Sequence, residues 1–147
     1  MNALWMRYVD DIFCSWPVQH SETIFLNTRN SLVPSINFTM EIERNGIPPF
    51  LDVSIHRIDR SFRFAVNRKS TNNLAFIHYF SSHPLSVKNS VFRSMFLRAL
   101  RVCSPEYLEP ELSLIRKIAE SHQFPSHIID KSYKLARETF DYGGGGG

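Results

Sequence analysis

The chain has 147 residues, of which 43% are hydrophobic and 21% charged, the composition of a folded protein with one domain or two small subdomains. No apolar run approaches the roughly 18 residues that a membrane helix needs, and the first residues lack the features of a signal peptide. We therefore expect an intracellular protein with no membrane partner. Two cysteines are too few for a disulfide framework and form no Cys-x-x-Cys pair suited to zinc.

The charge balance favours a polyanionic partner. Seventeen lysines and arginines against fourteen acids give a net charge of +3 and an isoelectric point near 9. The distribution is uneven, because residues 93–101 hold three arginines and no acid, whereas residues 106–120 are rich in acids. A nucleic-acid-binding face is therefore expected to be local.

A hairpin with two acids at its tip is the first predicted element. The β-prone runs 4–9 and 12–16 flank Asp10 and Asp11, and Pro17 ends the second run. A helix follows, with Ser21 as its predicted N-cap and Pro34 closing it.

Three further strands are predicted after this helix. Apolar and polar residues alternate over 36–43, the pattern of a half-buried strand. Asn45 and Gly46 then supply the positive φ angles that a hairpin turn needs. Residues 50–56 and 62–68 read as two more strands, joined at residues 59–61.

The rest of the chain is predicted to be helical. One helix runs from Pro84 to Arg101, Ser104 and Pro105 cap the next region, and Pro110 starts its main helix. Residues 124–126 separate that helix from a last one that ends near Phe140. The fold class is therefore α+β, a small antiparallel sheet with one helix followed by an all-helical unit. The terminal glycines, residues 143–147, are expected to be disordered.

The two adjacent carboxylates at the hairpin tip repel each other unless something neutralises them. A divalent cation, Mg²⁺ or Mn²⁺, prefers such oxygens, and two ions about 4 Å apart can activate a hydroxyl and stabilise a leaving pyrophosphate. Successive strand positions face opposite ways, so Asp10 is the favoured ligand and Asp11 the secondary one. The alternative is that both are simply turn residues, because Asp is a common turn former.

The string Arg-Tyr-Val-Asp-Asp-Ile-Phe at residues 7–13 resembles the third conserved polymerase motif of reverse transcriptases, and the residues after it resemble those of Penelope-like retroelements. The likeness continues at residues 38–41, 49–53, 68–69 and 78–84 and covers nearly all of residues 4–140. The chain departs from the family at residues 67–71, where Asn-Arg-Lys-Ser-Thr stands in place of the usual Tyr-Arg-Lys-Pro-Thr.

This resemblance implies a polymerase palm over residues 1–70 and a helical thumb over 71–142, with an RNA template, a DNA primer and dNTPs as partners. Asp10 and Asp11 would be the catalytic metal ligands, for two ions in the complete enzyme. Tyr8 and Val9 would lie beside the primer end. The segment Phe50, Leu51 and Asp52 would match the primer grip, although core packing of a strand also explains at least two of Phe50, Leu51 and Val53.

The same resemblance implies that parts of the enzyme are missing. The family has fingers and an earlier palm strand with another catalytic aspartate, all N-terminal to the hairpin, and a nuclease domain at the other end. We therefore expect a fragment that is inactive alone, and a nuclear location in keeping with work on nucleic acid.

An arginine face is predicted on the helix after Pro84. Apolar residues fill one side, and Arg93, Arg98 and Arg101 share the other, where they can contact phosphates without reading bases. Arg68 and Lys69 would extend this face toward the sheet. An ordinary solvated helix face is the alternative.

A non-catalytic helix-turn-helix module that binds nucleic acid is a second reading of the helical part. The helices on either side of residues 124–126 allow it. Against it, the last helix mixes acids with Lys131, Lys134 and Arg137 and has no cluster of base-reading residues near its start.

Overall fold

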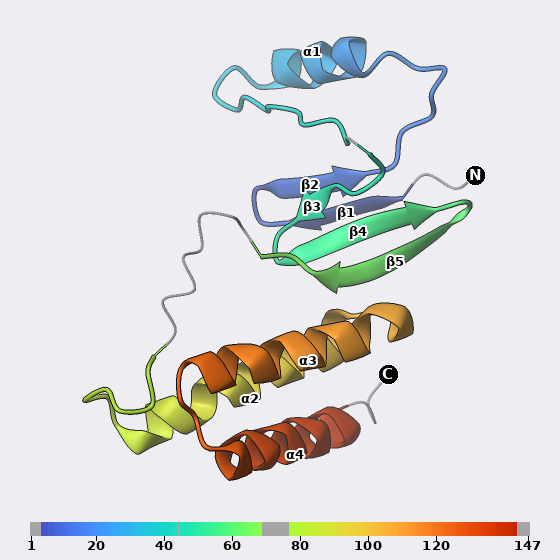
Figure 1. Ribbon diagram of the computed structural model, residues 1–147. Helices are drawn as coiled ribbons and strands as arrows, with labels where there is room; N and C mark the ends of the chain where they lie inside the picture. Colours follow the sequence, from blue (N-terminus) through green and yellow to red (C-terminus); the bar gives the residue numbers. More distant parts are fainter. Residues whose placement is uncertain (1–3, 44, 69–76, 144–147) are drawn as a thin grey trace.

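The computed structural model describes residues 4–43, 45–68 and 77–143, and this part of the chain is α+β (Figure 1). Two small antiparallel sheets and one helix come first, and three helices follow. The elements are β1 (Trp5–Tyr8), β2 (Asp11–Cys14), α1 (Glu22–Leu32), β3 (Pro49–Phe50), β4 (Val53–Ile58), β5 (Ser61–Val66), α2 (Leu85–Val102), α3 (Pro105–Ser121) and α4 (Ser126–Gly143). Lys69, the predicted palm-to-thumb boundary and the terminal residues 144–147 lie outside the described residues.

The predicted first hairpin is present. β1 pairs with β2 in an antiparallel register that matches Trp5 with Cys14 and Tyr8 with Asp11. Val9 and Asp10 form the two-residue turn, so Asp11 is the first residue of β2 rather than part of the turn.

The helix α1 begins where its cap predicts and is held to the hairpin by aromatic contacts. The Ser21 hydroxyl accepts a hydrogen bond of 3.4 Å from the Ile24 backbone N–H, which is the N-cap geometry. Phe25 packs on Trp16, with 4.5 Å between ring centroids, and meets Trp5 edge-on at 6.4 Å. No residue of α1 is fully buried.

The predicted strand over residues 36–43 is wrong, because none of these residues forms a strand. A strand is stable only when it pairs, and here a side chain takes up the backbone groups instead: both the N–H and the C=O of Phe38 bond to the Asn30 amide, at 2.7 and 3.0 Å. The apolar side chains that alternate along the segment remain largely exposed, Ile36 at 50% and Ile42 at 63%.

The single strand predicted over residues 50–56 is also wrong, because a turn at Leu51 and Asp52 divides it into β3 and β4. β4 then pairs with β5 from Val53–Val66 to Ile58–Ser61. The predicted turn at Asn45 and Gly46 does have positive φ at both residues, 60° and 73°. The carbonyl of Gly46 accepts a 3.0 Å bond from the N–H of Arg57, which ties this turn to β4.

The helical part follows the predicted order, with corrections to its boundaries. α2 spans almost the predicted residues, but α3 starts at Pro105, and Pro110 lies inside the helix rather than at its start. A proline inside a helix removes the bond from its own nitrogen to the carbonyl four residues earlier, here that of Glu106, yet α3 continues through Pro110. The last boundary, predicted at residues 124–126, lies at residues 122–125, and Gly143, predicted to be part of a disordered tail, is instead the last residue of α4.

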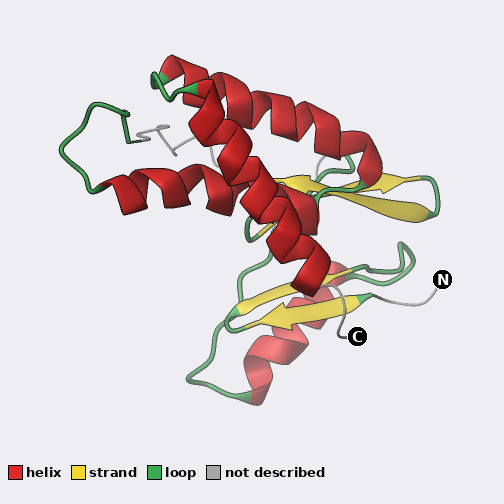
Figure 2. Cartoon of the chain, turned by 90° about the horizontal axis from the view of Figure 1, so that it is seen from below, coloured by secondary structure: helices red, strands yellow, loops and turns green. Residues whose placement is uncertain are grey.

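Most of the buried core lies among the three C-terminal helices. α2 packs extensively against α4 and also contacts α3 (Figure 2). In the described part of the sheet region only Ile55 is a fully buried hydrophobic residue. The core of the helical unit consists of Phe92, Phe96, Ala99, Leu100, Leu112, Ile115, Ile118, Ala119, Phe124, Ile129 and Ala136.

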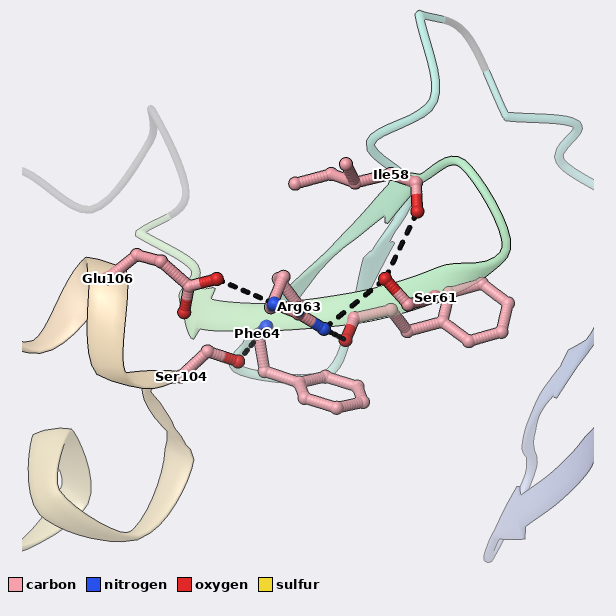
Figure 3. A network of polar contacts seen from close by, with 7 residues as sticks. Ile58, Ser61, Arg63, Phe64, Ser104 and Glu106 are labelled. Carbon is pink, nitrogen blue, oxygen red and sulfur yellow. Dashed lines mark hydrogen bonds and ion pairs between the residues drawn. The ribbon is translucent and has the colours of Figure 1, made fainter.

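Polar contacts join β5 to the start of α3 (Figure 3). Phe64 and Ser104 exchange two bonds of 2.8 Å, from the Phe64 N–H to the Ser104 hydroxyl and from the Ser104 N–H to the Phe64 carbonyl. Arg63 pairs with Glu106 at 2.6 Å. These contacts fix the sheet on the helical unit. No helix in the described part of the chain is long and apolar enough to cross a membrane.

Candidate metal-binding turn and nucleic-acid interface

The turn between β1 and β2 has an unusual backbone. Val9 has a φ of 51°, and Asp10, the second central residue, is not among the residues with positive φ. Two-residue turns with positive φ only at the first central position normally place glycine there. A β-branched residue in this region is a conformational outlier, and such strain costs about 1–3 kcal/mol and tends to persist at functional sites.

The carboxylates of this turn are open to solvent. Asp10 and Asp11 are exposed, as are the neighbouring Tyr8, at 62%, and Val9, at 66%. Within residues 4–43, 45–68 and 77–143, no ion pair involves either aspartate. The nearby Arg7 instead donates from Nε to the carbonyl oxygen of Val9, at 3.0 Å. Both carboxylates are therefore available to a cation.

The donor set fits Mg²⁺ or Mn²⁺ in kind but not in number. Carboxylate oxygens are the ligands that these ions prefer, and Mg²⁺ commonly keeps several waters beside one or two carboxylates. Among the described residues, no group of three or more His, Cys, Asp or Glu side chains is placed to hold a metal ion. Asp10 and Asp11 would thus be two of the ligands and would bind an ion weakly by themselves.

The segment Phe50, Leu51 and Asp52 lies close to this hairpin. The ring of Phe50 is 5.8 Å from that of Phe13 in β2, which favours a packing role for Phe50. Leu51 and Asp52 are exposed in the turn between β3 and β4, and Leu51 has a φ of 57°. The β1–β2 turn and the β3–β4 turn lie at the same end of the two sheets (Figure 1).

The three arginines predicted on α2 are all exposed, but they divide into two groups. Arg93 bonds to the Thr139 hydroxyl on α4, with 3.0 Å from Nη2 to Oγ1. Arg98 and Arg101 lie further along α2 and both line a shallow groove of about 370 Å³. The groove is lined by Ser94, Leu97, Arg98, Arg101 and Val102.

Ion pairing distinguishes Arg98 and Arg101 from many of the other arginines. In the part of the chain that the structure describes, neither has a carboxylate partner. The arginines that do are Arg57 with Glu43, Arg63 with Glu106, Arg68 with Glu111, Arg116 with Asp130 and Arg137 with Asp141. Arg98 and Arg101 therefore keep their charge free for an external anion.

Arg68, which the sequence placed on the nucleic-acid face, is engaged elsewhere. Its guanidinium gives two hydrogen bonds to the partly buried carboxylate of Glu111, one of them 2.7 Å long. This pair links the end of β5 to α3 and leaves Arg68 poorly suited to a phosphate. Lys69, its predicted neighbour on that face, lies outside the described residues.

Sequence reasoning missed three residues of these two sites. Leu97 and Val102 lie one helical turn from Arg101 and Arg98 respectively, so the i, i+4 spacing could have placed them beside the arginines. Arg7 could not have been found in this way, because its bond to Val9 depends on the conformation of the turn.

A family model described as the animal helix-turn-helix domain matches residues 75–134. The match spans α2, α3 and the first half of α4, and leaves out both sheets, one of which is the β1–β2 hairpin. A search of curated proteins and a search of solved structures found no match to the chain.

Proposed function

We propose that the chain binds nucleic acid through the groove on α2, with little dependence on base sequence. The observation that carries the proposal is the pair Arg98 and Arg101, exposed, adjacent and without a carboxylate partner in the described residues. Guanidinium groups bind phosphate oxygens with two parallel hydrogen bonds. The match of residues 75–134 to a helix-turn-helix family supports the same class of partner.

The lining of the groove suits a sugar-phosphate backbone. Ser94 adds a hydroxyl donor beside the two arginines, and Leu97 and Val102 offer an apolar surface to the sugar. Contacts of this kind position a nucleic acid but carry no sequence information.

The salt dependence of binding tests this proposal. Phosphate contacts release counterions, so affinity for a duplex should fall steeply as salt rises. Replacing Arg98 and Arg101 together with alanine should flatten the slope of log affinity against log salt by about two units. Arg57→Ala is the matched control, because that exposed arginine is paired with Glu43. An unchanged slope in the Arg98 and Arg101 double variant would remove the groove from the interface.

We further propose that the chain supplies the palm hairpin and thumb of an RNA-directed DNA polymerase of the Penelope-like type. The observation that favours this function over plain binding is the strained turn, with Asp10 in it and Asp11 directly after it, both exposed and neither in an ion pair among the described residues. Bound divalent ions would supply the charge that activates a primer 3′-hydroxyl and stabilises the leaving pyrophosphate. Asp10 and Asp11 would hold them, and Tyr8 and Val9 would flank the primer end.

In this assignment the exposed turn at Leu51 and Asp52 contacts the primer, and Phe50 holds that turn against the hairpin through Phe13. The groove on α2 holds the primer-template duplex. The resemblance assigns a further metal ligand to a palm strand N-terminal to the hairpin, so the 147-residue chain by itself should extend no primer.

Primer extension tests the catalytic proposal. Fusion to the fingers and early palm of a full-length relative should produce extension of an end-labelled primer on an RNA template, and Asp10→Ala should abolish it with little effect on folding. Asp11→Ala should also reduce extension severely but leave more residual activity than Asp10→Ala. Equal activity of the Asp10→Ala and parent fusions would refute the metal assignment.

The second candidate function is a helix-turn-helix module that binds nucleic acid without catalysis, favoured by the family match alone. In that case the fusion would show no extension. Binding would depend on base sequence and would be lost on changing exposed residues of α4, such as Lys131 and Lys134, rather than Arg98 and Arg101.

A further inference from the structure

We infer that Arg7 is a positioning residue that holds the Val9–Asp10 turn in its strained conformation and so sets the direction of the Asp10 carboxylate. The inference rests on the proposed metal-binding role of this turn. Arg7 lies in β1 opposite Ile12, one residue pair before the turn begins. Its Nε donates to the carbonyl oxygen of Val9 at 3.0 Å.

The hydrogen bond from Arg7 acts on the peptide group between Val9 and Asp10. The carbonyl of Val9 belongs to the peptide group that leads into Asp10, and peptide groups are planar. Fixing the carbonyl oxygen therefore fixes the orientation of the whole group, which includes the nitrogen and Cα of Asp10, and leaves only the φ of Asp10 to set where its Cβ points. Relaxation of Val9 to a negative φ would turn this group and move the carboxylate with it.

The turn needs such a restraint because its own residues do not favour it. A glycine would adopt the 51° φ of Val9 without strain, but valine resists it. The hydrogen bond from Arg7 offsets part of that cost.

Arg7 also leaves the metal ligands free. An arginine beside two aspartates would ordinarily pair with one of them and compete with a cation. In the described residues Arg7 makes no ion pair with Asp10 or Asp11, and its hydrogen bond goes to a backbone carbonyl instead. The side chain therefore restrains the turn without occupying the carboxylates.

NMR of the 147-residue chain tests the inference without any assay of activity. A residue with positive φ gives a strong intraresidue NOE between its amide and α protons, and that signal at Val9 should weaken in Arg7→Ala. The dissociation constant for Mn²⁺, measured from paramagnetic broadening of the Asp11 and Ile12 amides, should rise by about 2- to 10-fold, the range for one lost hydrogen bond. Adding Val9→Gly to Arg7→Ala should recover most of the Mn²⁺ affinity.

Arg7→Lys separates positioning from charge, because it keeps the positive charge but lacks the Nε donor. It should resemble Arg7→Ala in both readouts. A lysine variant that matches the parent would overturn the inference, as would a double variant that recovers no affinity. If the parent itself does not bind Mn²⁺, the proposed metal site fails, and the NOE at Val9 still decides whether Arg7 holds the turn.

Discussion

At the scale of residues, positive φ angles mark the places where the backbone departs from what its side chains prefer. Asn45 and Asp59 tolerate this region, because their short polar side chains bond locally. Val9 and Leu51 have no such polar side chain, and they belong to the β1–β2 and β3–β4 turns, which lie at the same end of the two sheets (Figure 1). Local strain of this kind is expected where a turn is shaped for function rather than for stability.

Gly46 gives a residue-scale prediction. Its φ is 73°, and a Cβ added there would meet nothing closer than 3.8 Å, from the carbonyl oxygen of Arg57. The cost of a side chain is therefore conformational rather than steric. Gly46→Val should lower the free energy of unfolding by about 1–2 kcal/mol or more.

The measurement is the denaturation midpoint, with Gly46→Asn as the matched control. Asparagine tolerates left-handed backbone and should cost clearly less than valine. Equal midpoints for Gly46→Val and the parent protein would mean that this turn does not have the described conformation.

At the scale of elements, the contact between β5 and α3 is a polar connection between two units with different cores. Ser104 satisfies the N–H and C=O of Phe64, so it occupies the edge of β5 at that point as a neighbouring strand would. The ring of His56 in β4 stacks on that of Tyr107 in α3, with 4.6 Å between centroids. The start of α3 is therefore positioned by hydrogen bonds and ring stacking.

Acid pH should weaken this connection. The backbone N–H of Glu106 itself and the guanidinium of Arg63 lower the pKa of the Glu106 carboxyl below its ordinary value of 4.5. A carboxyl whose folded pKa is depressed contributes stability that is present above its unfolded pKa and lost as pH falls through the folded pKa. The contribution should therefore be complete above about pH 4.5 and disappear below it.

Glu106→Gln removes that titration, so its stability should depend less on pH below about 4.5 than that of the parent protein. Thermal melts across pH 2.5–7 measure the difference, at roughly half-unit intervals, with Glu109→Gln as the control on the same helix. If Glu106→Gln and the parent lose stability in parallel below pH 4.5, Glu106 has no ionised role at this junction.

At the scale of the whole molecule, burial is concentrated in one half of the chain. Eleven hydrophobic residues form one buried cluster in the helical unit, and the described sheet region adds only Ile55. Local stability follows buried apolar contact, so the two units should open with different free energies.

Amide hydrogen exchange should reveal this difference. Protection should be greatest along α2, α3 and α4 around Phe96 and Ile115, and weakest in α1 and the β1–β2 hairpin. If a duplex binds at Arg98 and Arg101 as proposed, adding it should raise protection in α2 first. Strands β1 and β2 that exchange as slowly as α2 in the free protein would contradict this distribution of stability.

Much of the local structure could be predicted from the sequence alone. The hairpin follows from two β-prone runs around Asp10 and Asp11, the start of α1 from the Ser21 cap, and α2 from its apolar face. These features depend on residues within a few positions of each other. Over such short stretches, the backbone preferences of the residues and the spacing of their apolar side chains determine the local structure. The two aspartates at the hairpin and the α+β class could be predicted for the same reason.

Only the tertiary structure decided which predicted features found partners. The alternating segment 36–43 forms no strand, because the bonds of Phe38 go to Asn30, and residues 50–56 are divided by the Leu51 turn. The same holds for charge. Arg68 and Arg98 look equivalent in the sequence, yet Arg68 pairs with Glu111, 43 positions away, whereas Arg98 has no carboxylate partner in the part of the chain that the structure describes. Pairing over such distances depends on how the units pack, which local sequence patterns do not encode.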